Sequence, residues 1–200
     1  KNKFYFMQNK NLKFLEKFNN PKNTRFASFI EAFKICNDRK LKIIVETGTA
    51  RDKTKFFFFN YFNWKDGMST PMFAEYAHVN KGELHSCDIS KTNIKNSKKF
   101  TKKFKKNIYY YCEDSLEFLN NFSKRIDFLY LDSLDGHNTI AASKPQLEEI
   151  KIAQKKFHEN SIVLLDDKGQ KTNLSIDYLF NLKYQIIYET DYQVLLSKIK

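Results

Sequence analysis

Glycine and cysteine are scarce in this chain, and long apolar runs are missing. The 200 residues include only five glycines and three cysteines. No apolar run approaches the ~20 residues that a membrane-spanning helix needs, and nothing at the start resembles a signal peptide, so we expect no membrane association. Cys36, Cys87 and Cys112 are widely separated, with no C-x-x-C pair. We therefore expect buried free thiols, no zinc site and a cytoplasmic location.

Acidic residues are also in the minority, and the formal net charge is +12. Such a charge is typical of nucleic-acid-binding proteins, but most of it is Lys rather than Arg, as in proteins from AT-rich genomes. The densest run, KNSKKFTKKFKK at 95–106, places Phe100 and Phe104 at helical spacing. We interpret its lysines as the solvated face of an amphipathic helix, with an anionic-partner surface as the alternative.

Seven apolar segments have the length and composition of β-strands. Helical patterns near 71–79, 91–105, 115–122 and 141–158 separate the first five, which is typical of a parallel sheet covered on both faces. The last two segments are joined only through Thr190 and Asp191, so they must pair antiparallel. We predict an α/β, doubly wound, seven-stranded, mostly parallel sheet. The strands are expected at 41–46, 82–88, 107–113, 126–132, 161–167, 184–190 and 192–198.

The first forty residues are predicted to be helical. Asn23 and Thr24 are candidate caps for a helix in which Phe26, Phe29, Ile30 and Phe33 recur at helical spacing. We expect two parts: a 1–40 helical segment that packs on the core or the substrate site, and a 41–200 catalytic domain.

Each of the first five predicted strands ends in an acidic residue. In an open parallel sheet, ligands bind at the carboxyl ends of the strands, near the point where the strand order reverses. One acid at a strand end is ordinary turn chemistry, but five on one edge indicate a site. These ends are Glu46-Thr47-Gly48-Thr49, Asp88, Glu113-Asp114-Ser115, Asp132 and Asp166-Asp167.

These motifs resemble those of the class I S-adenosylmethionine-dependent methyltransferases over residues 41–198. VETGTA is similar to the family's first motif, GELHSCDIS to the second, YCEDSLEFL to the third, IDFLYLDSLDGHN to the fourth and SIVLLDD to the fifth. The resemblance implies a Rossmann-like fold with S-adenosylmethionine as cofactor. It implies that Asp88 accepts the ribose hydroxyls and that Asp114 and Ser115 contact adenine. Gly48 would let the cofactor approach the backbone, between Thr47 and Thr49. Glu46 would bind the cofactor's amino group or order the loop.

The chain departs from the family after Thr49, where a second glycine is usual. Arg51-Asp52-Lys53 follow instead, and an aromatic-rich insertion runs to residue 68. Gly67, Ser69 and Thr70 would then complete the cofactor loop, with Thr70 capping the next helix and Pro71 at its first helical position. The 51–68 insertion is either a lid or binding loop, or a segment whose aromatic side chains pack in the core.

The acids after the fourth and fifth strands resemble the metal ligands of metal-dependent O-methyltransferases. Asp132, Asp166 and Asp167 would hold Mg²⁺, which prefers oxygen ligands and lowers the pKa of a bound hydroxyl. The lysine that follows the fourth-strand acid in that group is missing here. His137 is therefore the candidate general base, with Asp135 as second choice.

The missing motifs narrow the reaction. No N/D-P-P-Y/F follows the fourth strand, which argues against N-methylation of adenine, and no G-x-G-x-x-G follows the first, which argues against a nicotinamide-dependent oxidoreductase. We predict O-methylation of a hydroxylated small molecule such as a sugar, with metal assistance; a homo-oligomer stays open. A metal-independent methyltransferase for another substrate class, or a non-catalytic nucleotide- or nucleic-acid-binding protein, is the alternative.

Overall fold

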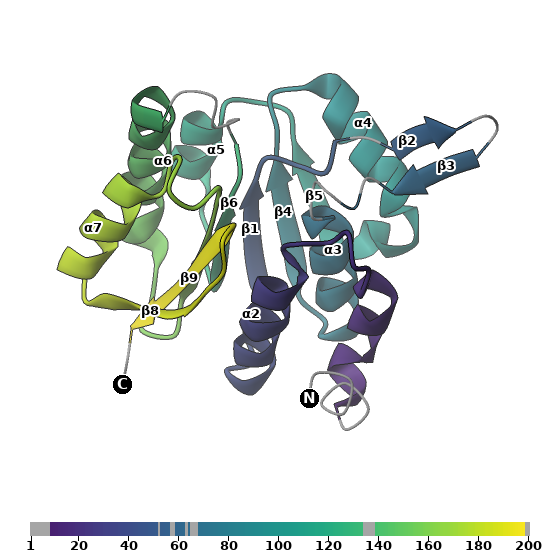
Figure 1. Cartoon of the computed structure of the whole chain (residues 1–200), viewed down its shortest axis with the longest axis horizontal. Helices are drawn as coiled ribbons and strands as arrows, with labels where there is room; N and C mark the ends of the chain where they lie inside the picture. Colours follow the sequence, from purple (N-terminus) through teal and green to yellow (C-terminus); the bar gives the residue numbers. More distant parts are fainter. Residues whose placement is uncertain are drawn as a thin grey trace.

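The computed structural model describes residues 9–51, 53–56, 59–62, 64, 68–133 and 139–198, with the backbone alone at 53–56, 59–62 and 139–142. A single seven-stranded sheet runs through the middle of this part of the chain (Figure 1). Its strands are β1 (Ile43–Thr47), β4 (Glu83–Cys87), β5 (Ile108–Tyr111), β6 (Phe128–Leu131), β7 (Ile162–Asp166), β8 (Tyr184–Glu189) and β9 (Gln193–Lys198).

The strand order is β5-β4-β1-β6-β7-β9-β8, and only β9 runs against its neighbours. The predicted fold, including the reversed final hairpin, is therefore confirmed. From β1 the chain builds outward first through β4 and β5, and then on the other side through β6 and β7. The point of reversal lies between β1 and β6, where ligands bind in sheets of this kind.

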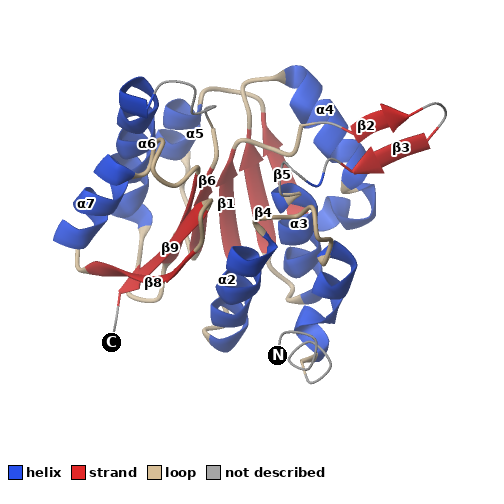
Figure 2. Cartoon of the chain, in the orientation of Figure 1, coloured by secondary structure: helices blue, strands red, loops and turns tan. Residues whose placement is uncertain are grey.

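Helices cover both faces of the sheet (Figure 2). Alternate strand residues face opposite sides, so Ile44 and Phe128 pack in one core cluster, while Val45 and Leu129 pack in the other. The first cluster includes side chains of η1, α2 and α3, and the second those of α5, α6 and α7. The helices are η1 (Lys10–Phe18), α2 (Phe26–Asp38), α3 (Ser69–Val79), α4 (Lys91–Phe100), η3 (Lys102–Asn107), α5 (Ser115–Asn121), α6 (Thr139–Ala153), η4 (Gln154–Lys156) and α7 (Asn173–Asn181).

The N-terminal helices pack directly on the sheet. Phe29 of α2 lies edge-on to Phe73 of α3 at 5.6 Å between ring centroids and to Tyr130 of β6 at 5.5 Å. The predicted capping of α2 by Asn23 and Thr24 is wrong, because the residue that precedes the helix is Arg25 and no side chain caps it. The side chain of Arg25 instead donates a hydrogen bond to the carboxylate of Asp166, the last residue of β7.

The insertion after β1 contains a separate two-stranded antiparallel sheet, β2 (Lys53–Phe56) and β3 (Phe59–Phe62), which the sequence analysis did not predict. The hairpin projects beside α4 in Figure 1. Trp64 packs partly buried against the first core cluster. The predicted cap of α3 is wrong: the helix begins at Ser69, preceded by Met68 in a left-handed conformation with φ +53°, and Thr70 lies in its first turn.

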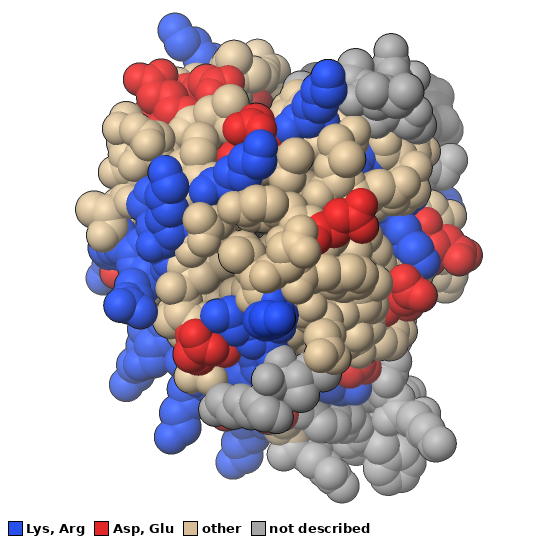
Figure 3. Space-filling view, turned by 90° about the vertical axis from the view of Figure 1, so that its left-hand side faces the viewer, with Lys and Arg blue, Asp and Glu red and all other residues tan. Residues whose placement is uncertain are grey.

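Surface lysines are widely distributed. Those of the 95–106 run are exposed, and Phe104 of the same run packs against the first core cluster, so the lysines do lie on a solvated face. The run is not the single helix predicted, because α4 ends at Phe100 and η3 begins at Lys102. Figure 3 shows the face of the molecule that carries α6 and α7. Further basic side chains, in blue, follow the left-hand edge of this view. The positive charge is therefore not confined to α4 and η3.

The cysteines are free, as predicted, but Cys112 is exposed, whereas Cys36 and Cys87 are buried. The expectation that all three are buried is wrong for Cys112, which lies just beyond the end of β5. Within the described residues, no helix has both the length and the apolar character needed to cross a membrane.

Candidate functional site

Two cavities meet at the carboxyl ends of β1 and β6. Gly48 and Ser133 line the first cavity. Their chain neighbours Thr49 and Asp132 line the second. The loops after β1 and β6 therefore form a shared wall, with one cavity on each side.

Gly48 is required by the way these two loops approach each other. Its φ is +83°, and a Cβ at this position would overlap the backbone carbonyl of Asp132. A side chain would force apart the loops after β1 and β6. A glycine was expected here because a ligand would approach the backbone, but the approach of the neighbouring backbone is sufficient to explain it.

Asp88, at the end of β4, lines the first cavity. One carboxylate oxygen accepts from the backbone N–H of Ser90 at 2.7 Å, and the other accepts from the N–H of Thr49 at 3.2 Å. The side-chain amide of Asn93 donates to the second oxygen at 3.1 Å. Backbone donors from two loops thus hold this carboxylate at the edge of the cavity.

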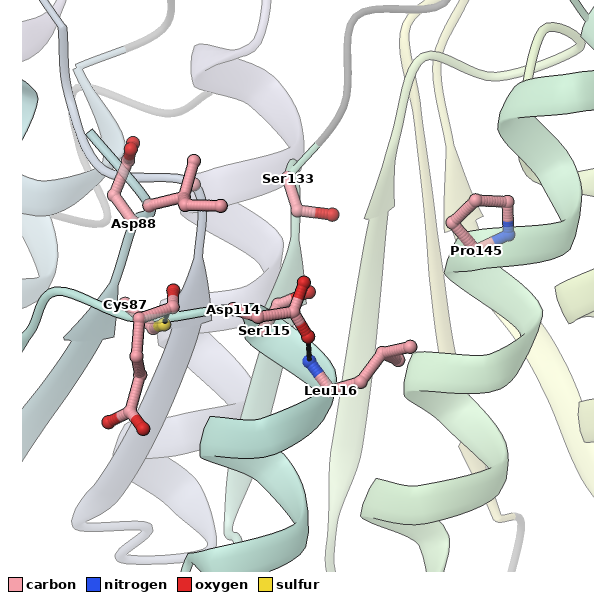
Figure 4. A pocket seen from close by; sticks show the side chains of 10 residues that line it. Cys87, Asp88, Asp114, Ser115, Leu116, Ser133 and Pro145 are labelled. Atoms are coloured by element: carbon pink, nitrogen blue, oxygen red, sulfur yellow. Dashed lines mark hydrogen bonds between the residues drawn. The ribbon is translucent and has the colours of Figure 1, made fainter.

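Asp114 and Ser115 also line the first cavity (Figure 4). The Asp114 carboxylate caps α5, because it accepts from the backbone N–H of Leu116 at 2.9 Å and of Glu117 at 3.3 Å. In Figure 4 it lies between Asp88 on one side and Pro145 of α6 on the other. The predicted adenine-side residues therefore do share one cavity with the predicted ribose-side acid.

Glu46 is completely buried and lines neither cavity. Its carboxyl accepts hydrogen bonds from the hydroxyls of Ser69 at 2.5 Å, Thr70 at 2.8 Å and Ser86 at 2.6 Å. Burial raises the pKa of Glu46 to about 7, although the three hydroxyls oppose the shift. Of the two predicted roles, this arrangement fits the ordering of the loop, because the carboxyl ties the start of α3 to β1 and β4.

The other predicted loop residues are close together but have different surroundings. Thr49 and Ser69 line the second cavity. The Thr70 hydroxyl accepts from the backbone N–H of Ala50 at 2.8 Å. Thr47 is buried, and its hydroxyl makes no hydrogen bond. Thr70 therefore holds the loop after β1. The cofactor-binding role of Ser69 and Thr70 stays a prediction.

The three predicted metal ligands converge. One carboxylate oxygen from each of Asp132, Asp166 and Asp167 lies within 4.8 Å of the other two. Two cationic side chains bind these carboxylates. Arg25 Nε lies 2.7 and 2.9 Å from the two oxygens of Asp166, and its Nη2 lies 3.1 Å from Asp167 Oδ1. Lys171 Nζ lies 3.0 Å from Asp167 Oδ2 and 3.3 Å from Asp132 Oδ1.

Burial and neighbouring charges both shift the pKa values of the side chains in this cluster. Burial raises the pKa of the Asp132 carboxyl well above its usual range, and the negative Asp166 adds to the shift. Burial alone would lower the pKa of Lys171, but Asp132 and Asp167 more than offset it, so its pKa is raised. Asp167 has φ +57°, an uncommon backbone conformation for a non-glycine residue.

Sequence reasoning missed Arg25 and Lys171. Arg25 lies 141 residues before Asp166, and Lys171 was one lysine among many. The only local signal was the spacing of Lys171, four residues after Asp167. The candidate bases His137 and Asp135 lie outside the described residues, as does Gly67, which was predicted to belong to the cofactor loop.

A family model described as a methyltransferase domain matches residues 64–168. That stretch is more than half of the chain, so the chain belongs to this methyltransferase family. The predicted enzyme class, a methyltransferase dependent on S-adenosylmethionine, is confirmed. No curated protein sequence matches the chain.

Solved structures show the same fold at low sequence identity. The Podospora anserina methyltransferase PaMTH1, solved with SAH bound, has a TM-score of 0.63 at 13% identity, covering 96% of this chain and 87% of its own. An rRNA methylase from Streptococcus thermophilus has a TM-score of 0.59 at 9% identity, covering 86% and 96%. The N-methyltransferase NodS from Bradyrhizobium japonicum WM9 has a TM-score of 0.58 at 11% identity, covering 89% and 96%. Their different descriptions leave the acceptor to be inferred from the site.

Proposed function

We propose that this methyltransferase transfers the methyl group of S-adenosylmethionine to a hydroxyl group of a small molecule. The donor occupies the first cavity and the acceptor the second. The observation that carries this proposal is the shared wall: consecutive residues of two loops, Gly48–Thr49 and Asp132–Ser133, line opposite cavities. Ligands bound in the two cavities would be neighbours, and methyl transfer requires the acceptor oxygen to meet the methyl carbon in line at the margin of this wall.

On the donor side, Asp88 accepts the ribose hydroxyls and Ser115 lies at the adenine end. The carboxylate of Asp88 already accepts from Asn93, so the ribose hydroxyls replace that side-chain amide, while the backbone donors of Thr49 and Ser90 stay in place. The fit is supported by the cavity itself, which Asp88, Asp114 and Ser115 line together.

On the acceptor side, the second cavity is lined by charged groups of both signs, among them Arg25, Asp132 and Asp167. Carboxylates accept hydrogen bonds from hydroxyls, and a guanidinium donates to neighbouring oxygen atoms. In the reaction the acceptor oxygen forms the new O–CH₃ bond, the S–CH₃ bond breaks to leave S-adenosylhomocysteine, and the hydroxyl proton passes to a base. His137 is the base we propose, with Asp135 as second choice.

The predicted Mg²⁺ ion agrees with the type and spacing of the three carboxylates but not with their partners. Arg25 and Lys171 already bind oxygens of all three acids. An ion would have to displace both side chains and would bring two more positive charges next to them. The arrangement described therefore does not fit a resident Mg²⁺, and we propose the metal-independent form of the reaction, with the two cationic side chains balancing the acids.

Nucleic acid is the competing acceptor, since one structural neighbour is described as an rRNA methylase. The second cavity does not favour a phosphate backbone, because its two arginines are offset by two acidic side chains. The lysines of the 95–106 run are exposed, but charge alone does not distinguish a binding surface from a solvated one.

The proposal is tested by a thermal-shift panel followed by a transfer assay. S-adenosylmethionine and SAH should stabilise the chain, and NAD and ATP should not, with or without Mg²⁺. Methyl transfer is then measured onto small hydroxylated acceptors and onto RNA, in EDTA. Transfer onto a small hydroxyl acceptor in chelator is the expected result. Transfer onto RNA alone would refute the acceptor class, and activity that is lost in EDTA and restored by Mg²⁺ would refute the metal-independent form.

A further inference from the structure

A group of buried polar atoms without partners lies beside the first cavity. Among the described residues, these include both carboxyl oxygens of Glu149, both side-chain polar atoms of Gln146 and the hydroxyl of Thr47. Glu149 is 1% exposed and Gln146 is 3% exposed. Buried polar groups are nearly always hydrogen-bonded, so a group of unpartnered atoms in one place requires an explanation.

Gln146 and Glu149 lie on the part of α6 that borders the first cavity. Toward its C-terminal end, the inner face of α6 contributes Ile150 and Ala153 to the second core cluster. One turn earlier the buried face becomes polar, at Gln146 and Glu149, and the neighbouring Pro145 lines the first cavity. The change from apolar to polar therefore coincides with the edge of the sheet where the cavity lies.

The Glu149 carboxyl lies near hydroxyl groups at, or just after, the carboxyl ends of three strands. Burial raises the pKa of the Glu149 carboxyl, and the hydroxyls of Ser115, Ser133 and Thr47 are near enough to oppose the shift. None of them makes a hydrogen bond of normal geometry to it. Ser115 follows β5, Ser133 follows β6 and Thr47 ends β1, and the first two line the cavity themselves.

An unsatisfied buried carboxyl destabilises the folded state, and an apolar residue at the same place on α6 would not carry this cost. The geometry therefore indicates a second arrangement, in which small movements of the three loops complete the hydrogen bonds. Each of these loops borders the first cavity, so filling the cavity is the event that would set their spacing.

We propose that Glu149 is a positioning residue for the cofactor: its carboxyl accepts hydrogen bonds from Thr47, Ser115 and Ser133 when the cofactor is bound, and so fixes the loops after β1, β5 and β6. This inference rests on the proposed placement of the cofactor in the first cavity. It assigns Glu149 no contact with the cofactor or the acceptor.

The test compares Glu149→Leu and Glu149→Gln with the wild type and with Glu148→Gln. Glu148 is the matched control, because it lies on the same helix with its side chain half exposed and paired with Lys151. The measurement is the Kd for SAH by calorimetry, together with the thermal midpoint of each variant without ligand. We expect Glu149→Leu to bind SAH about tenfold more weakly, the equivalent of one lost hydrogen bond to a charged group. Glu149→Gln, which retains an acceptor oxygen, should recover most of the affinity.

A purely structural role predicts a different pattern. The loss of affinity should then follow the loss of thermal stability, whereas our proposal expects Glu149→Leu to bind weakly with an undiminished thermal midpoint. If the midpoint does change, a double-mutant cycle distinguishes the two roles. It compares the Kd for SAH of the wild type, Glu149→Leu, Ser133→Ala and the double variant. The Ser133 substitution should weaken binding when Glu149 is present and have little effect in Glu149→Leu. Equal affinity of Glu149→Leu and wild type, or additive effects in the cycle, would overturn the proposal. Failure of the wild type to bind SAH would instead overturn the cofactor placement on which it rests.

Discussion

The carboxylates beside the two cavities are held in different ways. Beside the first cavity, where we propose that the donor binds (the donor side), Asp88 and Asp114 accept hydrogen bonds from backbone N–H groups, most of them within three residues along the chain. Beside the second cavity, where we propose that the acceptor binds (the acceptor side), Arg25 binds Asp166 and Asp167, which are more than a hundred residues away, and Lys171 binds both Asp167 and Asp132.

The difference follows from burial. Asp88 and Asp114 remain in contact with the cavity and solvent, so a few backbone donors suffice to hold them. Asp166 is completely buried, and a buried carboxylate without an opposite charge is costly. The acceptor side therefore depends on the N-terminal segment for its charge balance, while the donor side is built within the loops of the sheet. The two sides should respond differently to substitution.

The largest expected loss of unfolding free energy follows a substitution on the acceptor side. Arg25→Met leaves Asp166 buried without its cation, and removing one partner of a buried pair costs about 3–5 kcal/mol of unfolding free energy. Urea denaturation measures this loss. The control is Lys168→Met, which removes a solvent-exposed ion pair with Glu189 and should cost less than about 1 kcal/mol. Equal losses in the two variants would contradict the burial argument.

The next largest effect on stability is expected at Glu46, a buried carboxyl that accepts hydrogen bonds from three hydroxyl groups. Its folded-state pKa of about 7 is above the ordinary value of 4.5, so the protonated carboxyl contributes stability that is fully present below pH 4.5. That contribution is lost as the pH rises through 7, and a shift of this size corresponds to roughly 3 kcal/mol.

Glu46→Gln isolates this titration, because the amide cannot ionise. The variant should be close to the wild type in stability near pH 4.5 and should become relatively more stable as the pH rises to 8. Denaturation curves at a series of pH values measure the difference. A constant difference across this range would show that Glu46 does not titrate with a raised pKa.

The contrast between the two sides also explains what the sequence was able to predict. The strands were predictable because each is a continuous apolar run, such as those around Val45 and Leu129, and such a run can be recognised from neighbouring residues alone. The ends of these strands fixed the position of Asp88 and Asp114 on one edge. The α5 cap is likewise a local contact, between Asp114 and residues two and three positions later.

The acceptor side was predictable only in part. The convergence of Asp132, Asp166 and Asp167 followed from the strand order, and the structure contains it. Arg25 was not predictable, because its sequence position in the first helical segment gives no sign of contact with the end of β7. Glu149 is similar: helical periodicity places it on the buried face of α6, and only the tertiary structure brings the hydroxyls of three loops to it.

On the donor side, Asp88→Ala should affect binding more than folding. Loss of a hydrogen-bonded charged group costs about 1.5–3 kcal/mol, so we expect the Kd for SAH to rise by roughly 10- to 150-fold. Calorimetry measures this change. Asp177→Ala, an exposed position on α7, is the control and should bind as the wild type does. Unchanged affinity in Asp88→Ala would remove this residue from the cofactor site.

The smallest expected effect is that of the cap. Asp114→Ala removes the acceptor for two backbone N–H groups at the start of α5, and loss of such a cap costs about 1 kcal/mol of unfolding free energy. Asp114→Asn keeps a capping oxygen while removing the charge, so it should stay close to the wild type. Because the freed N–H groups can bond to water at this exposed helix end, the loss in Asp114→Ala should be well below that in Arg25→Met. A loss as large as that of Arg25→Met would mean that the donor side, too, depends on buried charge, and the distinction between the two sides would fail.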